Sequence, residues 1–205
     1  MTDVLGVILA GGLSRRMEGP EKSLLELGNL PLVQHVSDRL RTQVSQVVLN
    51  ANGDAKRFDF LGLSVVGDTV KDFAGPLAGV LAGMRWAHEN TNASHILTAA
   101  ADTPFFPEDY AARMISELKA QNAQIVLASS AGRRHPVFGL WSVDLADNLE
   151  KFLVDEEGRK VMLFVERYRS SLAEFKATDP DPFFNVNTPD DMRLAEEFVL
   201  EHSDT

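Results

Sequence analysis

The sequence has no cysteine, few basic residues and no long apolar run, and each absence excludes a class of protein. Without cysteine the chain has no disulfide bonds and no thiolate metal site, which fits the cytoplasm, where we expect the protein. The net charge of -10, from 30 acidic and 20 basic residues, argues against long-range attraction of nucleic acid or an anionic membrane. The longest clearly uncharged apolar run, residues 73–84, is shorter than the roughly 20 residues of a membrane helix. No basic region precedes the first apolar run, so we expect no signal peptide.

Apolar runs alternate with stretches of helical periodicity along the chain, which has 205 residues and 44% hydrophobic content. Strands are expected at residues 4–9, 44–49, 63–66, 96–101, 125–128, 135–141, 171–176 and 183–187. Helices are expected at residues 31–40, 75–89, 107–121, 143–154 and 159–168, and in a last helix from Pro189 that Thr188 caps. The alternation predicts a three-layer, Rossmann-like α/β fold, with helices on both faces of a mostly parallel mixed sheet. We expect a single domain over residues 1–205, with residues 202–205 frayed.

The segment after the first apolar run is the strongest motif in the sequence. It reads Leu-Ala-Gly-Gly-Leu-Ser-Arg-Arg-Met from residue 9 and leads to Lys22. Gly11 and Gly12 let the backbone turn tightly, and successive N–H groups in such a turn can bind one anion. With Arg16 and Lys22 nearby, the segment predicts a polyphosphate site; the alternative is an ordinary strand-to-helix turn. Its spacing excludes a P-loop, a dinucleotide loop and a hydrolase nucleophile elbow.

Polar residues follow the carboxyl ends of several predicted strands. Besides the glycine loop, they are Asn50, Asp68, Asp102, Asn185 and Asn187. The carboxyl ends of parallel strands meet at one edge of a sheet, and ligands of open α/β sheets bind there. The strand ends therefore predict one ligand site without reference to the glycine motif.

Asp102 is the candidate metal ligand. It follows a strand that ends in small residues, and Mg²⁺ is usually held by one or two carboxylates together with phosphates and waters. We therefore expect Mg²⁺ at Asp102; an Asx turn before Pro104 is the alternative. Asn187 is a weaker candidate for the metal, with helix capping as its alternative. In a strand, Asn185 would face the same way as Asn187.

Four further residues combine a candidate function with a plain structural explanation. Lys22 suits a phosphate, although lysines are more often solvated at the surface. Gly75 opens a Gly-Pro-Leu-Ala-Gly segment that could lie against a nucleotide base or simply begin a helix. Arg134 and His135 form a basic spot that could bind the phosphate of a second substrate or be a solvated surface.

Taken together, the motifs resemble those of the molybdenum cofactor guanylyltransferases, usually called MobA, within the nucleotidyltransferases that activate sugars and cofactors. The matching pieces span almost the whole chain: residues 9–12, 15–17, 22–27, 34–36, 47–52, 75–79, 102–104, 134–136 and 184–189. Each piece is weak alone, whereas together they are specific. One departure is Glu21, where many relatives have Asp before the lysine.

The resemblance implies transfer of GMP from GTP to molybdopterin, with release of pyrophosphate and with Mg²⁺ as cofactor. Carried over by position, the residues expected to contact GTP are Leu9, Ala10, Gly11, Lys22, Asn50, Asp68 and Asp102, to which the loop and the helix start add Gly12 and Gly75. The residues expected to act in catalysis are Arg16, Lys22 and Asp102. The residues expected to bind the acceptor are Arg134, His135 and Asn185.

The paired glycines favour the GTP-using branch, because the cytidylyl branch tends to carry Ala before a single Gly. The alternatives are a cytidylyltransferase for the same pterin, a sugar-phosphate nucleotidyltransferase, and a non-catalytic nucleotide-binding docking protein. We expect transient contacts with molybdoenzyme maturation proteins, and neither nucleic acid nor a membrane as a partner.

Overall fold

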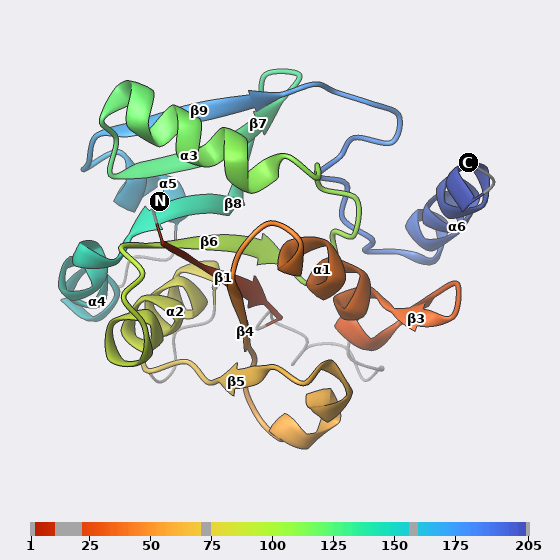
Figure 1. Ribbon diagram of the computed structural model, residues 1–205, viewed down its shortest axis with the longest axis horizontal. Coiled ribbons are helices and arrows are strands. Elements are labelled where there is room, and N and C mark those ends of the chain that lie inside the picture. Colours follow the sequence, from red (N-terminus) through yellow and green to blue (C-terminus); the bar gives the residue numbers. More distant parts are fainter. Residues whose placement is uncertain (1–2, 11–21, 71–74, 156–159, 204–205) are drawn as a thin grey trace.

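The computed structural model describes residues 3–10, 22–70, 75–155 and 160–203. Within these ranges a seven-stranded sheet has the order β5-β4-β1-β6-β8-β7-β9 (Figure 1). Its strands are β1 (Val4–Leu9), β4 (Gln46–Asn50), β5 (Ser64–Val66), β6 (His95–Ala100), β7 (Ile125–Ser130), β8 (Arg133–Ser142) and β9 (Ser170–Phe175). Neighbouring strands are parallel except at β8, which runs antiparallel to β6 and β7. The predicted mixed, mostly parallel sheet is therefore confirmed.

Helices cover both faces of the sheet. They are α1 (Leu32–Arg41), α2 (Pro76–Asn90), α3 (Tyr110–Gln121), α4 (Ala146–Asp155), α5 (Val161–Val165) and α6 (Pro189–Ser203). α1 and α3 bury Val36 and Met114 in the core on one face, while α2, α4 and α5 bury Leu81, Leu149 and Phe164 on the other. The sheet thus lies between two helical layers. No helix in the described ranges is both long and apolar enough to cross a membrane.

The central strand β1 shows why this layering needs a continuous apolar run. Val4 and Ile8 enter the core under α1 and α3, whereas Leu5 and Val7 enter the core under α2. Successive side chains of a strand point to opposite faces, so a strand covered on both sides must be apolar at nearly every position. Burying each such side chain contributes about 1.5–3 kcal/mol.

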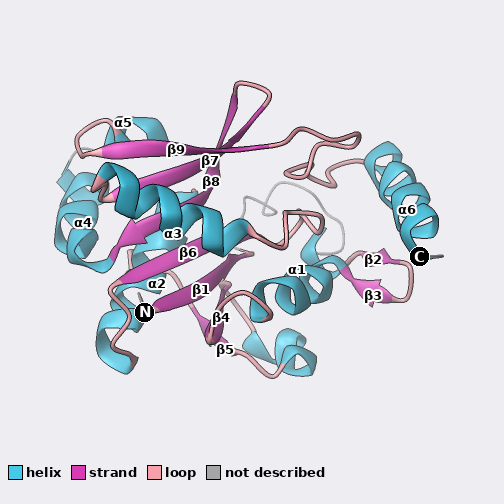
Figure 2. Cartoon of the chain, turned by 45° about the horizontal axis from the view of Figure 1, so that its top comes forward, coloured by secondary structure: helices cyan, strands magenta, loops and turns pink. Residues whose placement is uncertain are grey.

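The last helix packs beside a short hairpin rather than on the sheet (Figure 2). Strands β2 (Glu26–Leu27) and β3 (Leu30–Pro31) form the hairpin, and it shares an apolar cluster with α6. The cluster contains Leu27, Leu32, Val186 and Ala195. As predicted, α6 begins at Pro189, and the Thr188 hydroxyl accepts a hydrogen bond from the backbone of its first turn. It continues to Ser203, and residues 204–205, also expected to fray, lie outside the described ranges.

The strand predicted at residues 183–187 is wrong. In the described structure the segment belongs to no sheet, and one backbone hydrogen bond, from Val186 N to Asp102 O at 2.9 Å, joins it to the turn after β6. Phe183 enters the core under α3, whereas Val186 enters the α6 cluster. The apolar residues of this segment therefore pack in two separate clusters rather than on one face of a sheet.

A bulge interrupts β8 beside β7. Leu127 pairs with Gly139 but the next residue, Ala128, pairs with His135, so residues 136–138 have no partner on β7. The buried Thr98 hydroxyl replaces the missing ladder: it donates to Val137 O at 2.6 Å and accepts from Gly139 N at 3.1 Å. It also accepts from Trp141 Nε1 at 3.1 Å. A single side chain on β6 thereby fixes the course of the bulge.

We expect Thr98→Val to destabilise the fold by roughly 3 kcal/mol, because it leaves two buried N–H donors and one carbonyl without a partner. For a chain of this size the melting temperature should fall by about 6–12 °C. Thr98→Ser keeps the hydroxyl and is the matched control. Equal melting temperatures for the two variants would show that the hydroxyl does not hold the bulge.

Candidate active site

The carboxyl ends of four neighbouring parallel strands form the sheet edge at which the sequence predicts a ligand site. Leu9 at the end of β1 is aligned with Asn50 on β4 and with Ala100 on β6. Beyond the strands, Ala10 N donates to Asn50 O at 2.9 Å and Ala101 N donates to Leu9 O at 3.1 Å. Leu9, Ala10 and Asn50 are therefore neighbours at one edge, and Leu9 is bonded to the turn that carries Asp102.

The predicted polyphosphate segment begins and ends at this edge. Residues 11–21, which include the candidates Gly11, Gly12 and Arg16, lie outside the described residues. On one side of the segment, Leu9 bonds to the turn after β6; on the other, Lys22 bonds to Asp102. Both flanks of the motif thus contact the strand end that carries the candidate metal ligand.

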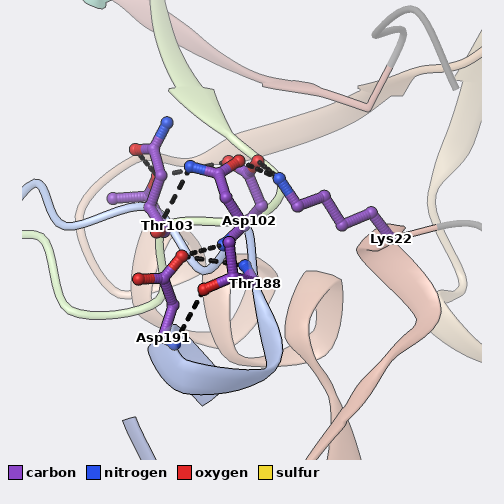
Figure 3. Close-up of polar contacts among 7 residues, drawn as sticks. Lys22, Asp102, Thr103, Thr188 and Asp191 are labelled. Carbon is purple, nitrogen blue, oxygen red and sulfur yellow. Dashed lines mark hydrogen bonds and ion pairs between the residues drawn. The ribbon is translucent and has the colours of Figure 1, made fainter. Parts of the chain in front are cut away.

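Lys22, Asp102 and Asn187 meet in a polar cluster, although they come from three distant parts of the chain (Figure 3). Lys22 begins a short 3-10 helix, η2 (Lys22–Leu24), and its Nζ lies 3.3 Å from Asp102 Oδ2. The same ammonium donates to Asn187 Oδ1. The side chains of Lys22 and Asp102 are 34% and 24% exposed, so a ligand can reach the cluster from solvent.

Asn187 is held in place by the start of α6. The carboxylate of Asp191 accepts hydrogen bonds from the backbone N–H groups of Asn187 and Thr188, at 2.9 and 2.8 Å, while Asp191 N donates to the Thr188 hydroxyl at 3.1 Å. These bonds form a reciprocal helix cap. The pKa of Asp191 is lowered, chiefly because Asn187 N–H donates to its carboxylate; Thr188 and the charge of Lys22 act in the same direction. The predicted cap therefore also positions a site residue.

Thr103 joins the turn after β6 to the segment before α6. Its hydroxyl is 2.7 Å from Asn185 Oδ1, to which it donates, and 3.3 Å from Asp102 Oδ1. Sequence reasoning missed Thr103 and Asp191 as site residues. The spacing of Thr188 and Asp191 resembles a capping box and was the available signal for Asp191. No local pattern marked Thr103.

A second cluster of hydrogen-bonded polar residues lies at this edge, on the side away from Asp102. Asn50 Nδ2 donates to Asp68 Oδ1 at 3.0 Å, and Asn52 Nδ2 donates to Asp68 Oδ2 at 2.7 Å. Asn50 is buried, and a Cβ atom at Gly79 would lie 2.2 Å from its Oδ1. Gly79 is thus required by the close approach of α2, while Gly75 is the residue that caps this helix. Because β4 and β6 flank β1, Asn50 lies two strand spacings, about 10 Å, from the β6 end.

The three candidate acceptor residues line one pocket. It has a volume of about 310 Å³ and is lined by Arg134, His135 and Asn185, and also by Asn187. The aromatic rings of Phe138 and Phe183 form an apolar part of its wall. The pocket is large enough for a small ligand.

The donors of the Lys22–Asp102–Asn187 cluster suit a hard cation. A carboxylate oxygen and an amide oxygen already converge on the positive ammonium of Lys22. Among the described residues, however, no three His, Asp or Glu side chains form a group able to hold a metal by themselves. The cluster therefore fits a cation such as Mg²⁺ that takes most of its ligands from phosphates and waters.

Solved structures share this architecture. Molybdopterin-guanine dinucleotide biosynthesis protein A from Archaeoglobus fulgidus superposes with a TM-score of 0.74 at 23% identity, covering 96% of this chain and 99% of that one. A CMP:2-keto-3-deoxy-manno-octonic acid synthetase complexed with CTP gives 0.75 at 13% identity, with coverage of 97% and 99%. At these identities the likeness concerns the fold alone.

The fold and the polar edge of the sheet define an α/β nucleotidyltransferase. Residues 6–171 match the family described as MobA-like NTP transferase domain. The molybdenum cofactor guanylyltransferase of Mesorhizobium japonicum is 46% identical over 196 residues, 94% of each chain, and that of Rhizobium meliloti is 45% identical over 199 residues, 94% of this chain and 90% of that one. The chain therefore belongs to the MobA-like nucleotidyltransferases, among the molybdenum cofactor guanylyltransferases. This confirms the resemblance drawn from the sequence motifs.

Proposed function

We propose that the protein transfers the GMP moiety of GTP to molybdopterin and releases pyrophosphate. The relatives with about 45% identity carry this activity in their names, and they match this chain over nearly its full length. The observation that supports the proposal best is the position of Asn187. This residue lines the pocket, and it accepts a hydrogen bond from the same Lys22 ammonium that is paired with Asp102. The cluster thus borders both the strand edge and the pocket.

In the proposed arrangement, the nucleotide lies along the strand edge. Its phosphates lie near Lys22 and Asp102 and also contact Gly11, Gly12 and Arg16. Its nucleoside end extends over Leu9 and Ala10 toward a polar wall formed by Asn50, Asp68 and the start of α2 at Gly75. The acceptor occupies the pocket lined by Arg134, His135 and Asn185, so that its phosphate meets the cluster from the other side.

The reaction needs charge neutralisation more than a covalent nucleophile. An oxygen of the acceptor's terminal phosphate attacks the α-phosphorus in line; one P–O bond forms, and the bond to the departing pyrophosphate breaks. The attacking phosphate is already ionised near neutral pH, so no general base is required. Lys22 and Arg16 neutralise the phosphate charge and hold the groups in line.

Asp102 and Asn187 would hold the divalent cation, for which we propose Mg²⁺. Enzymes that transfer phosphoryl groups generally use such a cation, which supplies charge neutralisation at the phosphate oxygens. Since the described residues offer one carboxylate and one amide to it, we expect the protein to bind Mg²⁺ tightly only together with the nucleotide. We also propose that the protein acts in the cytoplasm. Because the product must reach apo-enzymes, we propose in addition that the protein makes transient contacts with molybdoenzyme maturation proteins.

Thermal shift with GTP, CTP, ATP and UTP, each with and without Mg²⁺, tests the nucleotide. At a concentration of 100 Kd a ligand stabilises the fold by about 2.7 kcal/mol, which raises the melting temperature of a chain of this size by roughly 5–10 °C. We expect this rise with GTP and Mg²⁺ together and a much smaller one with the other nucleotides. A selective rise with CTP would instead assign the protein to the cytidylyl branch.

A transfer assay with labelled GTP tests the acceptor. We expect label to enter a dinucleotide only when molybdopterin is present. Transfer to a sugar phosphate in the absence of molybdopterin would contradict the proposal. Selective nucleotide binding without transfer to either acceptor would indicate a docking protein instead of an enzyme.

A further inference from the structure

His135 ends a short chain of hydrogen bonds at the wall of the pocket. Its Nε2 is 2.7 Å from the hydroxyl of Ser130, and that hydroxyl is 2.6 Å from Asp181 Oδ2. Ser130 ends β7 and His135 lies on β8, whereas Asp181 comes from the segment that leads to α6. Neither Ser130 nor Asp181 has a role in the proposed function.

The chain of bonds fixes where the imidazole carries its proton. The hydroxyl of Ser130 has one proton, and the carboxylate of Asp181, which can only accept, receives it. The hydroxyl must therefore accept from His135, so Nε2 of the imidazole is the protonated nitrogen. In the neutral ring, Nδ1 then carries a free lone pair. Among the described residues, Nδ1 has no hydrogen-bond partner.

The ring is also fixed in orientation and kept neutral. It stacks on Phe183 with centroids 4.5 Å apart and is only 9% exposed. Burial is the main cause that lowers the pKa of His135 below its ordinary value; Arg133 acts in the same direction, while Asp181 and Glu174 oppose it. Arg134 and Asp191 are the other charged groups that line the pocket.

We propose that His135 binds the acceptor through Nδ1, which accepts a hydrogen bond from a ring or amino N–H of a planar heterocycle, and that Ser130 and Asp181 are its positioning residues. This inference rests on the proposed function and identifies the heterocycle as the part of the acceptor that His135 recognises. A neutral lone pair does not attract phosphate, for which Arg133 and Arg134 stand on the same strand. The aromatic wall of Phe138 and Phe183 suits a flat ring, and a pterin is flat and rich in N–H donors.

The order of the three residues excludes a nucleophilic triad. In a triad the serine donates to the histidine and the carboxylate orients the histidine. Here the serine lies in the middle, is fully buried and donates to the carboxylate. The arrangement therefore sets a tautomer and does not activate a nucleophile.

Nitrogen NMR of the free protein tests the tautomer without any substrate. Of the five histidines, His135 is assigned by the signal that disappears in His135→Gln. We expect Nε2 protonated and Nδ1 unprotonated at pH 7.5, and a mixture of tautomers in Ser130→Ala. A protonated Nδ1 in the wild-type protein would overturn the proposal.

Kinetics with matched variants test the contact. The amide of Asn can place an oxygen near the position of Nδ1, whereas Gln can replace Nε2 but not Nδ1. We expect His135→Gln to raise KM for molybdopterin about tenfold, the effect of one lost hydrogen bond, with KM for GTP unchanged. His135→Asn should stay within about threefold of wild type. Equal values for the two variants, both folded by melting temperature, would contradict the proposal.

The pH profile gives a further readout. Below the pKa of His135 the ring gains a proton at Nδ1 and can no longer accept, so KM for molybdopterin should rise as the pH falls through that value. The rise should be absent in His135→Asn; a rise of the same size there would assign the effect to another group. Failure of the wild-type protein to use molybdopterin at all would refute the proposed function and leave the NMR result standing, so the two failures are distinguishable.

Discussion

Asp102→Asn should reduce transfer of the nucleotide by about a thousandfold, the loss typical when one electrostatic contact to the reacting group is removed. Asn has the same shape as Asp but no charge. The variant therefore has a neutral amide in place of the carboxylate, in the cluster with Lys22 and Asn187. The fold should be little affected, because partly exposed ion pairs contribute about 0–1 kcal/mol. The measurements are the initial rate at saturating GTP and Mg²⁺ and the melting temperature.

Asp147→Asn is the matched control for this substitution. Asp147 is an exposed carboxylate on α4 and is paired with Arg85 at 2.7 Å. β8 ends at Ser142, which pairs with His95 at the first position of β6, so α4 starts from the sheet edge opposite to Asp102. We expect this variant to keep the wild-type rate. Full activity of Asp102→Asn would remove Asp102 from the catalytic site and with it the proposed place of the cation.

The position of Asp102 illustrates how much of the site the sequence can predict. Its strand was recognisable from a local apolar run, and the parallel arrangement then placed its end beside Leu9 and at the same sheet edge as Asn50. These inferences need only the period of the side chains and the rule that parallel strands share a carboxyl edge. The layers, the mostly parallel sheet and the helix start at Pro189 follow from the same local signals.

The remaining parts depend on contacts between distant residues. Phe183 and Val186 lie three positions apart and are buried by two different clusters, and in the described structure their segment belongs to no sheet. The bulge of β8 depends on the hydroxyl of Thr98, which lies on another strand. Asp181 reaches Ser130 across 51 positions of the chain. No periodicity of the sequence encodes such pairings, because each one exists only after the chain has folded.

Lys22→Ala should produce two effects of opposite sign. Loss of the ammonium removes a phosphate contact, so we expect GTP to bind more weakly and kcat/KM for GTP to fall about a hundredfold. The same loss frees Asp102 Oδ2 and Asn187 Oδ1, the oxygens that the ammonium now occupies and that we assign to the cation. In the absence of nucleotide, Mn²⁺ should therefore bind roughly threefold to tenfold more tightly, allowing for solvent screening at these partly exposed groups.

Weaker use of GTP together with tighter Mn²⁺ binding would show that the ammonium of Lys22 occupies the cation position in the free protein. A lysine that merely lies nearby would not produce both changes. Mn²⁺ affinity can be followed by the electron paramagnetic resonance of the free ion, and GTP affinity by calorimetry; Lys151→Ala, an exposed lysine on α4, is the control. Weaker GTP binding with unchanged Mn²⁺ affinity would mean that the ammonium and the cation occupy different positions. If both change as expected, we infer that the arriving triphosphate draws Lys22 away from Asp102 and thereby frees Oδ2 for the cation. That exchange would explain why an ion pair forms at the centre of a site that we propose binds phosphate.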